Sequence, residues 1–102
     1  MTHHEMPELR STVRDFSEAT LRPMGGDVDE KNHISWEVVK LLATEGLFKY
    51  VIPVEYGGVG IECQQLCLIW EELARVCLHA DQTFAMSGLG SYPITRFGTE
   101  EQ

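Results

Sequence analysis

Basic residues are scarce in this chain of 102 residues. Lys and Arg together number 8 against 16 Asp and Glu, which gives a net charge of −8. A protein that binds nucleic acid through its phosphates needs a basic face, so this balance argues against a nucleic-acid partner. It argues equally against attraction to an anionic lipid surface. We therefore interpret the acidic excess as a contribution to solubility.

Long apolar runs are absent as well. No stretch approaches the roughly 20 apolar residues that a membrane-spanning helix needs, so the sequence predicts no membrane span. Residues 1–7 carry no basic region followed by an apolar stretch, and so they do not resemble a secretory signal. The chain has three cysteines, which is an odd number, and all lie in one segment: Cys63, Cys67 and Cys77. This pattern favours a reducing compartment over a disulfide framework, and we expect a cytoplasmic protein.

Glycine and proline are concentrated in one segment, Ile52-Pro53-Val54-Glu55-Tyr56-Gly57-Gly58-Val59-Gly60. Pro53 pushes the residue before it towards an extended conformation, and the three glycines allow positive φ. We interpret the segment as a tight connector that lays the second half of the chain against the first. A phosphate-binding loop is the alternative. No Lys-Ser or Lys-Thr follows and no clear strand precedes, so a structural turn is favoured.

The rest of the chain shows apolar residues at helical spacing. Helices are expected over residues 8–22, 36–45, 62–78 and 82–90, with a short or frayed helix over 24–32 and a last turn through Phe97. Residues 47–52 are expected to be a short extended approach to the connector. No β-sheet is predicted. The sequence thus predicts one all-α domain over residues 1–102, a small antiparallel bundle of five to six helices.

Several helix ends have clear signals. Ser35 is a good N-cap and Gly46 sits where a C′ glycine should. Pro23 suits the first turn of a new helix, whereas Pro93 should break or kink the helix that Asp81 caps. The expected buried faces are Trp36, Val39 and Leu42 in one helix, and Leu66, Ile69, Trp70, Leu73 and Cys77 in another.

The helix over 82–90 carries no charged residue and has small side chains all round. A helix without a polar face is normally buried between other elements, and we expect that here. Beyond it, Thr99 and Gln102 have the spacing of a capping box, with acidic residues between them. A helix start signal with no helix behind it indicates that the natural polypeptide continues and that this chain is a fragment.

Residue types alone give weak signals of chemistry. Cys63, Cys67 and His79 match no structural zinc spacing, so buried core cysteines are the favoured interpretation. The adjacent pairs Glu71-Glu72 and Glu100-Glu101 point to different faces of a helix, and we expect solvated charges in preference to an acid–base pair. No Ser-His-Asp set can be assembled.

Several short motifs resemble the N-terminal helical domain of acyl-CoA dehydrogenases when they are taken together in their order and spacing. They are Val13-Arg14-Asp15-Phe16, Leu21-Arg22-Pro23, Trp36-Glu37-Val38, Glu45-Gly46-Leu47, the connector over 52–60, Glu71-Glu72-Leu73-Ala74-Arg75, Gly90-Ser91-Tyr92-Pro93-Ile94 and Arg96-Phe97-Gly98-Thr99-Glu100-Glu101-Gln102. The resemblance implies an FAD-dependent enzyme in which the flavin takes a hydride from Cβ of an acyl-CoA while a carboxylate removes the α proton. The product is a trans-2-enoyl-CoA, and the electrons leave through an electron-transferring flavoprotein.

The resemblance also implies a middle β-domain, a C-terminal helical bundle and a homo-oligomer, commonly a tetramer. In the family the catalytic Glu lies in the C-terminal bundle and most FAD contacts come from the other two domains. We therefore assign no catalytic and no cofactor-binding residue to this chain, and expect the isolated chain to be inactive. The resemblance assigns one wall of the acyl pocket to Gln82, Thr83, Met86, Ser87 and Gly90.

Two further functions stay open. One is a stand-alone helical interaction module that keeps the fold without catalysis. The other is a flavin-binding domain in its own right, which would give a yellow protein. Reading the codons after Gln102 would separate the module from the enzyme.

Overall fold

A computed structural model describes residues 6–31 and 33–102 of the protein. Residues 1–5 lie outside the described residues. They belong to the N-terminal stretch that is predicted not to be a secretory signal. Asn32, the last residue of the short helix expected over 24–32, also lies outside the described residues.

The described residues form five α-helices and no strand, which confirms the all-α prediction. The helices are α1 (Met6–Phe16), α2 (Arg22–Glu30), α3 (Trp36–Glu45), α4 (Cys63–Ala74) and α5 (Leu78–Phe97). A π-helical segment, Ser17–Leu21, joins α1 to α2, and two 3₁₀ segments, Leu47–Val51 and Val54–Tyr56, follow α3. The expectation that residues 47–52 are extended is wrong for 47–51, because the Gly46 and Lys49 carbonyls accept 3₁₀-type hydrogen bonds there, whereas Ile52 is extended.

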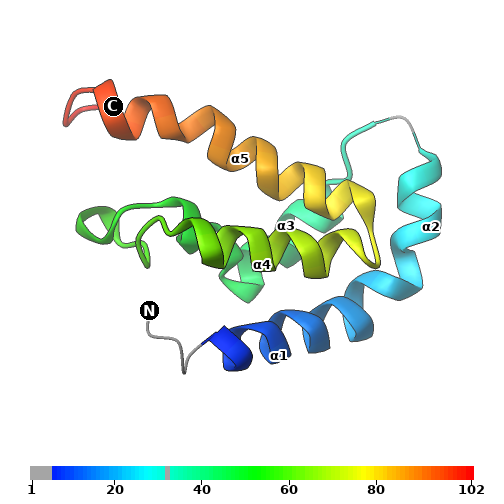
Figure 1. Cartoon of the computed structure of the whole chain (residues 1–102). Helices are drawn as coiled ribbons and strands as arrows, with labels where there is room; N and C mark the ends of the chain where they lie inside the picture. The colour runs from blue at the N-terminus through cyan, green and yellow to red at the C-terminus, as the bar shows by residue number, and fades with distance from the viewer. Residues whose placement is uncertain (1–5, 32) are drawn as a thin grey trace.

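Helix α4 is the centre of the bundle. It lies between α1 and α5, with α3 behind it and α2 crossing one end (Figure 1). α5 runs antiparallel to α4, whereas α1 runs in the same direction as α4. The buried apolar core comprises Leu9, Val13, Leu21, Val28, Val38, Leu42, Leu47, Val51, Leu68, Ile69, Leu73, Cys77, Ala80 and Phe84.

The caps of α3 agree with the sequence. Ser35 Oγ accepts a hydrogen bond from the Val38 backbone N–H at 3.3 Å, and Gly46 ends the helix at φ 84°. The expected buried face is wrong in part, because Trp36 is 67% exposed while Val38 and Leu42 are buried. These two residues are one turn apart and therefore share the face that meets the core.

Helix α5 differs from the expectation at both ends. It begins at Leu78, and its first N–H groups are capped by Asp29 of α2. Asp29 accepts from the backbone N–H of Leu78 at 3.1 Å and of His79 at 2.8 Å. The expected cap Asp81 lies inside the helix. Pro93 does not end the helix, which continues to Phe97. Pro93 only removes the donor for one carbonyl in a stretch of α5 that is open to solvent.

Glu72 of α4 carries the main polar contact between helices. Its side chain is 0% exposed and accepts hydrogen bonds from Arg10 at 2.6 Å and from Arg14 at 3.1 and 2.9 Å. A third arginine, Arg75, contacts the same carboxylate at 3.3 Å. The hydrogen bonds from Arg14 and Arg10 lower the pKa of the Glu72 carboxyl, although burial acts in the opposite direction. The prediction that both Glu71 and Glu72 are solvated is therefore wrong for Glu72, whereas Glu71 is exposed.

Adjacent glycines in α2 give a matched pair of substitutions. A Cβ on Gly25 would lie 2.3 Å from the Val76 carbonyl oxygen, whereas a Cβ on Gly26 would meet nothing within 4 Å. We expect Gly25→Ala to destabilise the fold by about 1–3 kcal/mol, because α2 must move off the turn before α5. Gly26→Ala should stabilise it by about 0.5–1 kcal/mol through helix propensity. Urea unfolding followed by far-UV circular dichroism measures both, and equal effects would contradict the packing of α2.

Glu72→Gln tests the buried ion cluster. We expect a loss of about 1.5–3 kcal/mol of unfolding free energy near neutral pH, the range for hydrogen bonds to charged groups. Because the folded-state pKa of Glu72 is lowered, its contribution is present above the unfolded pKa and disappears as the pH falls through the folded pKa. The difference between wild type and variant should therefore shrink on acidification.

Glu71→Gln is the control for that substitution. Glu71 is the next residue along the helix, is 62% exposed and contacts Arg10 alone at 3.4 Å. An exposed pair of this kind contributes about 0–1 kcal/mol. Equal losses for the two variants across the pH range would show that burial of Glu72 is not what stabilises the helix pair.

Candidate functional site

An apolar cleft lies between residues 63–70 of α4 and residues 85–92 of α5. Its volume is about 600 Å³, within the range of small-molecule sites. The lining residues are Val51, Ile61, Cys63, Leu66, Trp70, Ala85, Met86, Gly88, Leu89 and Tyr92. None of them is charged, so the cleft suits an apolar ligand.

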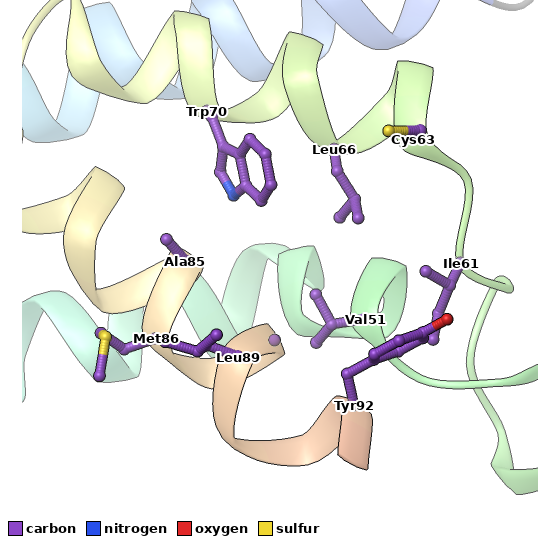
Figure 2. Close-up of a pocket in the computed structure, with 10 residues that line it drawn as sticks. Val51, Ile61, Cys63, Leu66, Trp70, Ala85, Met86, Leu89 and Tyr92 are labelled. Atoms are coloured by element: carbon purple, nitrogen blue, oxygen red, sulfur yellow. The ribbon is translucent and has the colours of Figure 1, made fainter. Parts of the chain in front are cut away.

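Helical spacing builds both walls of the cleft. Cys63, Leu66 and Trp70 recur at three and four residues on α4, which places them on one face. Ala85, Met86 and Leu89 extend from the facing side of α5. Figure 2 shows these two rows facing each other, with Val51 between them and Ile61 and Tyr92 at the Cys63 end. The predicted face thus divides. Ile69, Leu73 and Cys77 enter the core, while Leu66 and Trp70 face the cleft.

Only the first half of α5 is held in the core. Phe84 is buried against Phe48, with ring centroids 6.3 Å apart, and a Cβ on Gly88 would lie 3.1 Å from Val51. Farther on, Leu89 is 67% exposed and Phe97 is 85% exposed. The expectation that this helix is buried on all sides is therefore wrong. Its neutral surface is apolar, but the described residues cover only one side of it.

The wall of the cleft contains one polar atom without a partner. Trp70 Nε1 is buried and has no hydrogen bond to any described residue. In Figure 2 the indole nitrogen points across the cleft towards the side that carries Ala85. Two serine hydroxyls of α5 bond to their own helix instead: Ser87 Oγ donates to the Thr83 carbonyl at 2.9 Å and Ser91 Oγ to the Ser87 carbonyl at 2.8 Å. Trp70 Nε1 is therefore a donor in this wall that no described residue satisfies.

The five residues assigned to an acyl pocket lie at different depths. Met86 lines the cleft and is 62% exposed. Thr83 and Ser87 are half-buried, whereas Gly90 is exposed with open space around it. Gln82 lines a separate depression that also includes Asp29 and His79. Their role in binding stays a prediction. The remaining residues of the cleft were not assigned to a site from the sequence, although the helical spacing already grouped Leu66 with Trp70.

The glycine-rich connector is a closed turn. Its backbone N–H groups bond within the segment and its approach: Gly57 to Val54, Gly58 to Pro53, Val59 to Lys49 and Gly60 to Ile52, at 2.9–3.1 Å. Gly57 and Gly60 have positive φ, and a Cβ on Gly58 would lie 1.9 Å from the Ile52 carbonyl oxygen. These four donors are therefore not available to a phosphate. The segment forms the tight turn that the sequence predicts, and the absence of a phosphate site there stays a prediction.

The cysteines divide into two kinds. Cys77 is buried, and burial raises the pKa of its thiol. Cys63 and Cys67 are exposed, so the expectation of core cysteines is wrong for these two. Across residues 6–31 and 33–102, no group of three or more His, Cys, Asp or Glu is placed to hold a metal ion. No helix in this part of the chain is both long and apolar enough to cross a bilayer.

Relatives of known family match almost the whole chain. Among curated proteins, the probable acyl-CoA dehydrogenase FadE25 of Mycobacterium tuberculosis is 35% identical over 97 residues, which cover 95% of this chain and 25% of that protein. The mitochondrial short-chain specific acyl-CoA dehydrogenase of Bos taurus is 33% identical over 103 residues, covering 96% and 25%. The 3-(aryl)acrylate reductase of Clostridium sporogenes is 33% identical over 100 residues, covering 97% and 26%.

The chain spans about a quarter of the length of these relatives. No solved structure gives a significant match. The family model described as "Acyl-CoA dehydrogenase, N-terminal domain" matches residues 3–102. With its helical fold and the relatives above, the chain therefore belongs to the acyl-CoA dehydrogenase family, as an N-terminal domain of that family.

Proposed function

We propose that this chain is the N-terminal domain of an FAD-dependent acyl-CoA dehydrogenase, an enzyme that converts an acyl-CoA thioester to a trans-2-enoyl-CoA. Within that enzyme α5 forms one wall of the pocket for the acyl chain. The observation that carries the proposal is the uncharged cleft of about 600 Å³ beside α5. An acyl chain needs such a site, because burial of each methylene group from water contributes about 0.8 kcal/mol.

In this proposal the residues of the chain bind the acyl group and exclude water from it. Met86 contacts the chain directly, and Gln82, Thr83, Ser87 and Gly90 complete the wall along α5 as other parts of the enzyme close over it. The exposed half of α5 supports this role, since an apolar surface of this extent calls for a covering partner.

FAD supplies the hydride acceptor of the reaction when it is bound. The glycine-rich connector is not used for its phosphates in this proposal, because the N–H groups of Gly57, Gly58, Val59 and Gly60 bond within the segment and its approach. No residue of this chain is therefore assigned to the cofactor or to proton removal. The proposed enzyme passes its electrons to an electron-transferring flavoprotein, forms a homo-oligomer and works in the cytoplasm.

A stand-alone interaction module is the second candidate. The same exposed face, which ends at Phe97, favours it, because an uncovered apolar helix can bind another protein. The two candidates differ in what the gene encodes after Gln102. A middle domain and a flavin-containing product support the enzyme, whereas a stop codon at that point supports the module.

Acyl-CoA binding to the cleft can be followed through Trp70. In a Trp36→Phe background Trp70 is the remaining tryptophan, so its fluorescence reports on the cleft alone. We expect octanoyl-CoA to change this fluorescence and CoA to leave it unchanged. Met86→Asp should weaken octanoyl-CoA binding by about tenfold or more, since about 1.4 kcal/mol is enough for that change.

Val54→Asp is the matched control. Val54 is also an exposed apolar residue, but it does not line the cleft. The same acidic substitution should leave binding unchanged there. A response to CoA equal to the response to octanoyl-CoA, or equal weakening by both aspartates, would contradict an acyl site beside α5.

A further inference from the structure

Three sulfur-containing side chains from two helices line one groove between α1 and α4. They are Met6, Cys63 and Cys67. Both thiols are exposed, so a ligand can reach them from solvent. Cys63 stands on the ridge between this groove and the apolar cleft and lines both. The acyl site proposed above makes no use of sulfur chemistry, so this group calls for a separate explanation.

The packing of α1 on α4 brings Met6 to the two cysteines. α1 runs in the same direction as α4 (Figure 1), and Arg10 of α1 contacts Glu71 of α4 at 3.4 Å. One turn of an α-helix is 3.6 residues. One turn back along both helices therefore brings Met6 level with Cys67, and a further turn back along α4 reaches Cys63.

The spacing of the two cysteines suits a shared ligand. Cys63 and Cys67 are four residues apart in α4, and side chains at this spacing have Cβ atoms about 5–6 Å apart on one face of the helix. Two metal–sulfur bonds of about 2.3 Å, the length of a zinc–thiolate bond, can bridge that span. Met6 begins α1 and is half-buried, so its thioether adds a third, neutral sulfur from the facing helix.

We propose that Met6, Cys63 and Cys67 form a three-sulfur binding site for a soft monovalent cation, represented by Cu(I). Thiolate and thioether sulfur are the side-chain ligands that select Cu(I). Binding replaces the two thiol protons, which pass to water. The copper enters and stays as Cu(I), so no electron is transferred and no oxidant or reductant takes part.

The ligand set separates Cu(I) from zinc. A structural zinc site needs four ligands in a tetrahedron. Within residues 6–31 and 33–102, no third His, Cys, Asp or Glu joins Cys63 and Cys67 in a group placed to hold a metal ion. Glu71 also lines the groove, but its carboxylate contacts Arg10. The third ligand is therefore a thioether, which favours a soft cation over zinc.

The test adds Cu(I), as its acetonitrile complex, to the intact 102-residue chain in the absence of oxygen. Native mass spectrometry gives the stoichiometry, and competition with a chromogenic Cu(I) chelator gives the affinity. We expect one Cu(I) per chain, with no displacement by an equal concentration of Zn(II). Cys63→Ser and Cys67→Ser should each weaken binding by about a hundredfold or more, because each loses a direct ligand and not only a residue that orients one. Met6→Leu should weaken it by about tenfold, because the lost ligand is neutral.

Met24→Leu is the matched control for Met6→Leu. Met24 is also a half-buried methionine, but it does not line the groove, so its substitution should leave the Cu(I) affinity unchanged. Far-UV circular dichroism checks that each variant is folded. Unchanged affinity in either serine variant, equal effects of the two leucine substitutions, one Cu(I) shared by two chains, or Zn(II) binding as tight as Cu(I) would each overturn the inference.

Discussion

The rest of the structure depends on one buried carboxylate. Glu72 holds two arginines of α1 and Arg75 at the end of α4, so it fixes how α1 lies along α4. A buried charge that lost these partners would be strongly unfavourable, which makes the register of the two helices specific. Once this face of α4 is committed to α1, the face that carries Leu66 and Trp70 is turned towards α5. The cleft is a consequence of that orientation.

The two ends of α5 differ in how they are packed. Its beginning is attached by the Asp29 cap, by the packing of Phe84 on Phe48 and by the close approach of Gly88 to Val51. Its later turns have no comparable contact and leave Leu89 largely exposed. A helix fixed at one end and open at the other gives a stable frame with an accessible apolar wall. The beginning of α5 thus holds the helix in the fold, and its later turns leave an apolar surface open.

Local chemistry made part of this structure predictable. Ser35 and Gly46 act through backbone groups within their own helix, and the reciprocal contacts of Thr99 with Gln102 are equally local. Other features depend on residues far apart in the chain. Asp29 replaces Asp81 as the cap of α5 across 49 and 50 residues, and Glu72 is buried because arginines 58 and 62 residues earlier reach it. Reading one helix at a time cannot find such partners.

The same distinction explains why the candidate site was found only in part. All five pocket residues assigned from the sequence lie on α5, whereas the facing wall of the cleft comes from α4. The connector between the two halves determines how these walls meet. It places Val51 before its turn and Ile61 after it at the same cleft, and Cys63 follows two residues later. The N–H groups of Gly57, Gly58, Val59 and Gly60 bond within the segment and its approach, so the connector acts as a tight turn that brings residues from both halves of the chain to one cleft.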